Sequence, residues 1–194
     1  MLSIKDGSVL VKATRKTIES CLKTGSFGEV KGFSQKAGVF VTLLIYSSRE
    51  LRGCIGFPYA TLPLGKAVCE AAKAAAFCDP RFPQLNENEL SKIIIEVSIL
   101  TKPEEIRCSK AELCKKVIIG RDGLIVNFHE SSGLLLPQVA VEWKWNSQEF
   151  IEHACIKTGL PANIWNERDC KLYKFQAQIF AEEKPDGDII EKQI

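Results

Sequence analysis

Leu51-Arg52-Gly53-Cys54-Ile55-Gly56-Phe57 is the stretch around which the chain is organised. The run from Val39 to Tyr46 before it is almost entirely apolar or β-branched, which predicts a strand buried on both faces. Ser47 to Glu50 then turn the chain back, so the quoted stretch should be the second strand of a β-hairpin. We therefore expect Cys54 to lie on a strand that leads directly to a helix.

The elements on either side of this hairpin follow from periodicity and capping residues. Helical spacing predicts an amphipathic helix from Val9 to Lys23, with Ser8 as its N-cap. A second, alanine-rich helix should follow Thr61 as N-cap and end at Asp79, which would bury Cys78 on its apolar stripe. Alternation over Ile93 to Leu100 predicts a strand whose Glu96 points away from the core.

The second half of the chain gives a similar set of elements. From Ser109 onward we expect a brief capped helix, a hairpin of Val117–Ile119 and Leu124–Phe128, a strand at Leu134–Leu136, a helix at Ser147–Thr158, a strand at Leu172–Phe180 and a frayed tail after Glu182.

The stretches from Val39 to Leu100 and from Leu124 to Phe180 share one order: strand, turn, strand, proline, helix, strand. This predicts an α+β fold of duplicated β-hairpin/helix/strand units, forming two sheet-plus-helix halves that meet at a cleft. The alternative is that the two similar orders of elements arise by chance, as they can in any α+β protein. We expect residues 1–194 to form a single domain with a larger and a smaller subdomain, the second repeat covering about residues 117–181.

Composition limits the class of protein. The 194 residues are 45% hydrophobic and 26% charged, as in ordinary globular proteins. A net charge of +2 argues against direct nucleic-acid binding. Because the sequence shows no signal peptide and no apolar run of the ~20 residues that cross a bilayer, we expect a cytoplasmic protein without membrane contact.

The eight cysteines include no C-x-x-C pair, so we expect them to be reduced and predict no metal site. The sequence also lacks G-x-G-x-x-G, a P-loop, H-E-x-x-H and G-x-S-x-G. No cofactor is therefore predicted.

Cys54 is the candidate nucleophile. Arg52 could stabilise its thiolate or grip an anionic substrate, and Gly53 and Gly56 could offer backbone N–H groups to a developing oxyanion. In the alternative interpretation Cys54 is a packing residue and the glycines serve a bulge or a tight bend. The sequence leaves both interpretations open.

Polar residues farther along the chain could complete a substrate site. Asp79 and Arg81 could bind an anionic group, or could form an internal salt bridge that anchors their loop. Asp79 and Glu96 are candidate bases, since His129 and His153, the two histidines, match no catalytic signature.

LRGCIG (51–56), followed by Pro63-Leu64, resembles the signature of the AMMECR-domain family. The resemblance continues through Gly38 to Leu43, the D-x-R-F-P segment from Asp79 to Pro83, and the strand from Glu96 to Thr101. It extends in order through segments at 120–126, 133–140 and 157–160. The family has no agreed reaction. The resemblance implies a Memo-like or radical-SAM protein as partner, because family members look like neighbours or fusion partners of such proteins.

Two functions follow as expectations. One is an enzyme-like protein that binds a small polar or anionic substrate at a cleft centred on Cys54, with a low thiol pKa. The other is a non-catalytic adaptor or regulator that docks a Memo-like or radical-SAM partner. The family resemblance also implies an older proposal, a role in transcription, replication, repair or translation.

Overall fold

The computed structural model describes residues 2–193 and divides the chain into two compact units. Unit 1 consists of the chain up to Leu100 together with Gln178–Gln193, and unit 2 consists of Thr101–Ala177. The architecture is α+β, as predicted, with one sheet of five strands and one of four.

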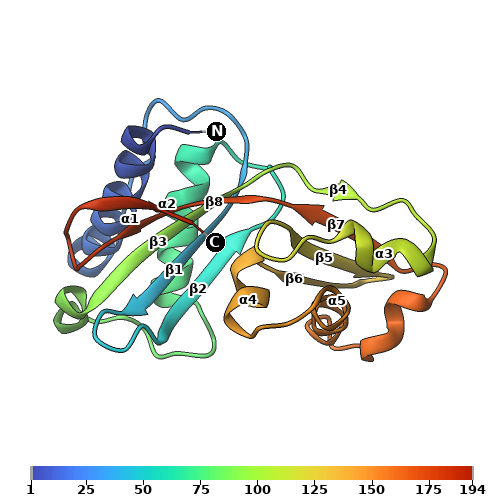
Figure 1. Ribbon diagram of the computed structural model, residues 1–194. Coiled ribbons are helices and arrows are strands. Elements are labelled where there is room, and N and C mark those ends of the chain that lie inside the picture. Colours follow the sequence, from blue (N-terminus) through green and yellow to red (C-terminus); the bar gives the residue numbers. More distant parts are fainter. Residues whose placement is uncertain (1, 194) are drawn as a thin grey trace. The chain divides into compact units, whose positions relative to one another are not determined.

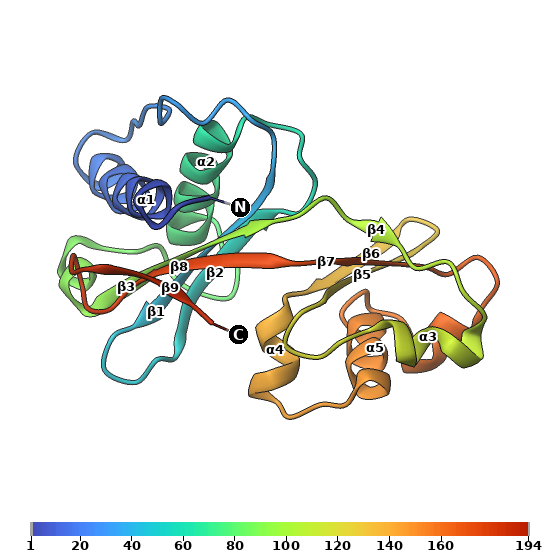
Figure 2. The same cartoon turned by 45° about the horizontal axis from the view of Figure 1, so that its top comes forward.

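Unit 1 is a five-stranded sheet covered by helices on one face (Figures 1 and 2). Its strands lie in the order β2-β1-β3-β8-β9, which makes β2 an edge strand. The elements are α1 (Ile4–Thr24), β1 (Gly38–Ile45), β2 (Leu51–Phe57), α2 (Leu64–Phe77), the 3₁₀ helix η1 (Glu87–Lys92), β3 (Ile93–Leu100), β8 (Ala177–Glu182) and β9 (Ile189–Lys192).

Helix α1 begins at Ile4 rather than at Val9, because the N-cap is Ser3 and not Ser8. The Ser3 side chain accepts from the backbone N–H of Asp6, and the Asp6 carboxylate accepts from the backbone N–H of Ser3, forming a capping box. The charged residues at the start of the chain hide the helical periodicity there, so the sequence pattern placed the start too late.

Helix α2 corrects two expectations about its ends. Its N-cap is Pro63, with no side-chain cap, so Thr61 does not have the predicted role. Cys78 comes after the last helical residue and is exposed, whereas the helical stripe predicted it to be buried. Once the chain leaves the helix, the periodicity that would turn position 78 inward no longer applies.

The C-terminal part of the chain differs most from expectation. The predicted strand from Leu172 to Phe180 is two strands, β7 (Lys171–Phe175) in the four-stranded sheet and β8 in the five-stranded sheet. The residues from Glu182 onward are not a frayed tail, because β9 pairs with β8 and the Glu182 carboxylate lies 2.6 Å from the buried Arg15 guanidinium.

Unit 2 is a four-stranded sheet of order β4-β7-β5-β6 with its helices on one face (Figure 2). Val117–Ile119 is not a strand; the hairpin joins β5 and β6, with Leu124 opposite Leu135. The elements are β4 (Glu104–Glu105), α3 (Lys110–Lys116), β5 (Gly123–Phe128), β6 (Ser131–Leu135), α4 (Pro137–Glu142), α5 (Ser147–Ile156), η2 (Ala162–Asn166) and β7.

The two sheets share part of their topology. In unit 1 the hairpin β1–β2 is followed by a helix and by β3, which pairs with β1. In unit 2 the hairpin β5–β6 is followed by helices and by β7, which pairs with β5. The counterpart of β3 therefore ends at Phe175 rather than at Phe180. The orders β2-β1-β3 and β6-β5-β7 agree with the predicted duplication, which stays a prediction.

Each unit has its own hydrophobic core. In unit 1, α1 and α2 pack on the sheet around residues such as Leu10, Val41 and Val68. In unit 2, α5 packs on β5 and β6 around Phe150 and Leu124. Among the residues that the structure describes, no helix combines the length and the apolar composition needed to span a bilayer.

Candidate functional site

Cys54 lies in the middle of β2, at the edge of the unit 1 sheet. The neighbouring position 53 faces helix α2, because a Cβ atom on Gly53 would stand 2.2 Å from the carbonyl oxygen of Ala75. Since side chains alternate along a strand, Cys54 points to the sheet face away from α2. Thr42 on β1 stands directly opposite it, and Glu96 on β3 stands opposite Thr42.

The Cys54 thiol is half-buried and has a polar neighbour. Its Sγ atom lies 3.2 Å from Oγ1 of Thr42, a distance at which either atom can be the hydrogen-bond donor. Thr42 and Cys54 thus form a cross-strand pair, in which side chains directly opposite each other on neighbouring strands interact. Thr42 did not stand out in the sequence, because a threonine in a buried strand is an ordinary β-former.

Asp79 and Arg81 together bind both backbone polar groups of Cys54. The N–H of Cys54 donates to Oδ2 of Asp79 at 2.8 Å, and Nη2 of Arg81 donates to the carbonyl oxygen of Cys54 at 3.2 Å. An edge strand leaves such groups without a partner strand. The two side chains therefore stand in for a neighbouring strand at this one residue, and we call them the Cys54 clamp.

The clamp is a tight ion pair. Nε and Nη2 of Arg81 donate to the two carboxylate oxygens of Asp79 at 2.9 and 2.7 Å. These hydrogen bonds lower the pKa of Asp79 to about 2. The same hydrogen bonds raise the pKa of Arg81. The Asp79 side chain is 2% exposed and the Arg81 side chain is 47% exposed. Asp79 is consequently ionised and fixed, while part of the guanidinium faces solvent.

Arg52 is engaged by a residue that the sequence did not single out. Its Nε and Nη2 atoms donate to the Glu89 carboxylate at 2.6 and 3.1 Å, and this pairing lowers the pKa of Glu89. The Glu89 carboxylate also accepts hydrogen bonds from the backbone and side-chain nitrogens of Asn86, which is the N-cap of η1. The Asn86-x-x-Glu89 pattern is a capping-box signature, which would have identified this carboxylate.

A bulge separates Arg52 from the regular register of β2. Leu43 is opposite Gly53 while Leu44 is opposite Leu51, so Arg52 is the extra residue. Strict alternation along the strand would place Arg52 and Cys54 on one face of the sheet, but the bulge interrupts this alternation. Arg52 is 7% exposed, and its Nη1 atom is buried with no hydrogen-bond partner among the described residues.

Both arginines lie against the same aromatic ring. The guanidinium carbon of Arg52 is 5.9 Å from the ring centroid of Phe82, and that of Arg81 is 5.5 Å from it. Both distances are within the range of cation–π contacts. Phe82 thus links the two ion pairs.

The two glycines of the signature are explained by close packing. A Cβ on Gly56 would stand 2.3 Å from the carbonyl oxygen of Val39, as one on Gly53 would stand against Ala75. Real Cβ atoms do not approach other atoms so closely, so both positions require glycine. This accounts for the glycines without an oxyanion-binding role, which stays a prediction.

Glu96 lies apart from the clamp. It is 5% exposed on β3, and its carboxylate accepts from Nζ of Lys192 on β9 at 2.5 Å. The structure therefore brings together Cys54, Asp79 and Arg81, and binds Arg52 and Glu96 to other partners. His129 and His153 belong to unit 2, where His129 stands edge-on to Phe128 and His153 stacks on Trp145.

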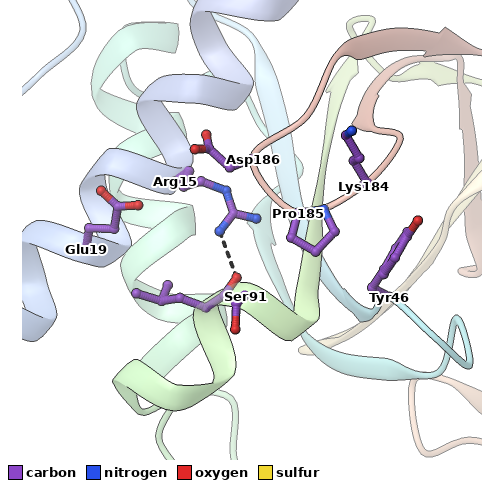
Figure 3. Close-up of a pocket in the computed structure, with 8 residues that line it drawn as sticks. Arg15, Glu19, Tyr46, Ser91, Lys184, Pro185 and Asp186 are labelled. Atoms are coloured by element: carbon purple, nitrogen blue, oxygen red, sulfur yellow. Dashed lines mark hydrogen bonds between the residues drawn. The ribbon is translucent and has the colours of Figure 1, made fainter.

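A cavity of about 450 Å³ lies elsewhere in unit 1 (Figure 3). Arg15 is at its centre, held by Glu182 and by a hydrogen bond to the carbonyl oxygen of Leu90 at 3.0 Å. None of its lining residues belongs to the Cys54 clamp, and its charged groups are of both signs: Arg15, Glu19, Lys184 and Asp186. No cysteine is among the described residues that line this cavity, so the candidate nucleophile Cys54 lies outside it.

No group of three or more histidine, cysteine, aspartate or glutamate side chains within residues 2–193 is arranged to hold a metal ion. All eight cysteines are free thiols. The polar chemistry around Cys54 therefore consists of one thiol, one hydroxyl and two carboxylate–guanidinium pairs.

Comparison with known proteins gives consistent matches over the whole chain. A family model described as AMMECR1 matches residues 11–180. A protein of Methanocella arvoryzae is 47% identical over 199 residues, and one of Pyrococcus abyssi is 47% identical over 204 residues; each match covers 100% of both chains. The crystal structure of the uncharacterized protein PH0010 from Pyrococcus horikoshii matches with a TM-score of 0.94 and 46% identity, covering 97% of each chain.

Proposed function

Since this chain belongs to the AMMECR1 family, we propose that it is an enzyme-like cytoplasmic protein that binds a small polar or anionic substrate beside a reactive Cys54. One observation carries the proposal: the backbone of Cys54 is held on both sides by a buried carboxylate and a half-exposed guanidinium, while its thiol stays partly exposed. A partly exposed thiol at a fixed backbone position favours a reactive role over a packing role.

The roles of the three residues follow from this arrangement. Cys54 would be the nucleophile, which requires a fixed position relative to its substrate. Asp79 would be a positioning residue, because it reaches Cys54 only through the backbone N–H. Arg81 would face the substrate with the exposed part of its guanidinium, a group suited to anionic or polar oxygen atoms.

The rate of Cys54 alkylation, followed across pH by mass spectrometry, tests this proposal. A positive guanidinium nearby favours the thiolate, so Cys54 should react faster at neutral pH than a model thiol of pKa ~8.5. Cys78 is an internal reference, since it is exposed in the same unit. A Cys54 that stays unlabelled, or that reacts only at the model rate, would favour the packing role.

A binding screen would then identify the substrate. Metabolites are tested against the wild-type chain and its Cys54→Ala variant, with Cys78→Ala as the matched control. Ligands that lose affinity only in Cys54→Ala support the proposed site. Ligands that bind all three proteins equally do not use it.

An adaptor function is the second candidate, and unit 2 supplies the observation that favours it. Large apolar side chains are exposed there, with Ile118 at 48%, Val141 at 45% and Trp143 at 67%. Exposed tryptophan is a common anchor of protein interfaces. If the chain docks a Memo-like or radical-SAM protein through this surface, Trp143→Ser should abolish co-elution with the purified partner, whereas Cys54→Ala should not.

A further inference from the structure

Two arginine side chains near Cys54 are bound in the same way and leave the same atom unused. Arg81 uses Nε and Nη2 for the Asp79 carboxylate, and Arg52 uses Nε and Nη2 for the Glu89 carboxylate. Within the described part of the chain, neither Nη1 atom has a hydrogen-bond acceptor. Each guanidinium therefore keeps an amino group whose two N–H donors have no acceptor among the described residues.

The unused donors of Arg52 are the more informative. The side chain is 7% exposed, and its Nη1 atom is buried without an acceptor. Buried polar groups in native proteins are nearly always satisfied, and an unsatisfied one indicates strain, a functional role or a missing ligand or water. Arginine has donors and no acceptor, so the missing group must contribute oxygen or another acceptor atom.

Three contacts relate the two guanidinium groups to the surroundings of Cys54. The Arg81 guanidinium donates to the carbonyl oxygen of Cys54, and its charge interacts with Cys54. The Arg52 guanidinium lies against the ring of Phe82, as that of Arg81 does. Two guanidinium groups thus lie against one aromatic ring next to the Cys54 clamp.

We infer that the ligand of the Cys54 site carries a carboxylate group, bound by the Nη1 amino groups of Arg81 and Arg52; this inference rests on the proposed function of Cys54. A carboxylate has two oxygen atoms, matching two separate donors, and hydrogen bonds between guanidinium and carboxylate are charge-assisted. Each arginine is already paired with one carboxylate, so recognition depends on directed hydrogen bonds more than on excess positive charge.

Two alkylating agents of nearly equal size test the inference, namely iodoacetate, which carries a carboxylate, and the neutral iodoacetamide. With either agent the Cys54 thiolate attacks the methylene carbon, the S–C bond forms as the C–I bond breaks, and iodide leaves. The quantity measured is the ratio of the iodoacetate rate to the iodoacetamide rate. Dividing it by the same ratio at Cys78 removes the intrinsic difference between the reagents.

We expect this normalised ratio to be about tenfold or more at Cys54, the effect of one charge-assisted hydrogen bond. Arg81→Gln should bring it close to one, and Arg52→Lys should lower it. Arg121→Gln is the matched control, since Arg121 is a 45% exposed arginine paired with a buried aspartate in unit 2. It should leave the ratio unchanged.

A second measurement does not depend on any variant's folding. Acetate in excess should slow the reaction of wild-type Cys54 with iodoacetamide, whereas chloride at the same ionic strength should not. A normalised ratio near one in the wild type, or a raised ratio that persists in folded Arg81→Gln, would overturn the carboxylate inference alone. A Cys54 that reacts with neither reagent would overturn the proposed function as well.

Discussion

Unit 1 and unit 2 each hold a buried aspartate paired with a half-exposed arginine. In unit 1 the side chains of Asp79 and Arg81 are 2% and 47% exposed, and in unit 2 those of Asp122 and Arg121 are 2% and 45% exposed. The two closest contacts, at 2.7 and 2.8 Å, are also alike. As isolated ion pairs they cannot be told apart.

The pairs differ in what they bind. Asp122 accepts one backbone N–H, that of Ile118, in the turn that precedes β5. The Cys54 clamp binds both the N–H and the carbonyl oxygen of one residue, and that residue carries a thiol. An Asp–Arg pair is thus a structural device, and its functional meaning depends on the backbone groups that it fixes.

Removing each aspartate should separate the two pairs most clearly. Asp79→Ala leaves the backbone N–H groups of Cys54 and Arg81 unsatisfied and frees the Arg81 side chain from its position, so we expect a loss of about 3 kcal/mol in the free energy of unfolding. Asp122→Ala leaves one N–H unsatisfied, that of Ile118, and should cost about 2 kcal/mol. Urea unfolding measures both losses, and equal losses would mean that the additional contacts of Asp79 add no stability.

Gly53 in β2 and Gly123 in β5 are both closely packed, but against different kinds of atoms. A Cβ on Gly53 would meet the backbone of Ala75, while one on Gly123 would meet the ring of Phe175 at 2.4 Å. A ring can rotate and a packed helix backbone cannot, so we expect Gly53→Ala to cost about 2 kcal/mol and Gly123→Ala about 1 kcal/mol. Thermal unfolding of the two variants decides the order, and a larger loss for Gly123→Ala would contradict it.

Acid should weaken the clamp in a defined direction. The Arg81 guanidinium lowers the pKa of Asp79 from its ordinary value of 3.8 to about 2. Stability from a depressed carboxyl pKa is present above the ordinary value and is lost as the pH falls through the folded value. Between about pH 5 and about pH 3, the wild type should therefore lose about 1 kcal/mol more than Asp79→Asn.

The same acid titration of Asp122→Asn provides the comparison with unit 2. The pKa of Asp122 is also lowered, because the hydrogen bonds from Arg121 and Ile118 outweigh the effect of burial. The stability advantage of the wild type over this variant should shrink in the same direction. If either difference instead grows as the pH falls, the assignment of that carboxyl as an ionised partner is wrong.

The smallest effect concerns thiols and leaves stability unchanged. Burial raises the pKa of Cys155 in unit 2 to about 11, whereas Cys78 in unit 1 is exposed. At neutral pH we expect Cys155 to be alkylated at least about a hundredfold more slowly than Cys78, since only the thiolate reacts. Mass spectrometry of the labelled native protein measures this. Eight thiols should be counted after denaturation without reductant, and fewer would contradict the reduced state.

The local parts of the fold were predictable because each depends on neighbouring residues. The strand bounds of β2 and β3 follow from apolar runs ended by turns, and the N-cap of α5 follows from Asn146 with Glu149 three residues on. The C-terminal strands were not predictable in this way. One run of alternating apolar residues supplies β7 and β8 to different sheets. The chain stays ordered beyond it through long-range contacts, namely the Glu182–Arg15 ion pair and the pairing of β9 with β8.

The candidate site shows the same limit. The sequence placed a thiol between glycines and proposed a role for Asp79 and Arg81, and both residues contact Cys54. It could not reveal that Arg52 would be held by Glu89, because a bulge sets that direction and no residue type marks it. Which side chains contact each other depends on the tertiary structure, whereas candidate reactive groups can be predicted from residue types.

The position of β2 at the rim of its sheet has a consequence for the protein in a crowded solution. A bare edge can recruit a strand from another molecule and so begin edge-to-edge aggregation. At the middle of β2 the outward N–H and carbonyl of Cys54 are already occupied by Asp79 and Arg81, and two residues earlier the bulge at Arg52 disturbs the spacing that an incoming strand would need. The side chains that position the thiol therefore also obstruct the addition of a strand from another molecule at this edge.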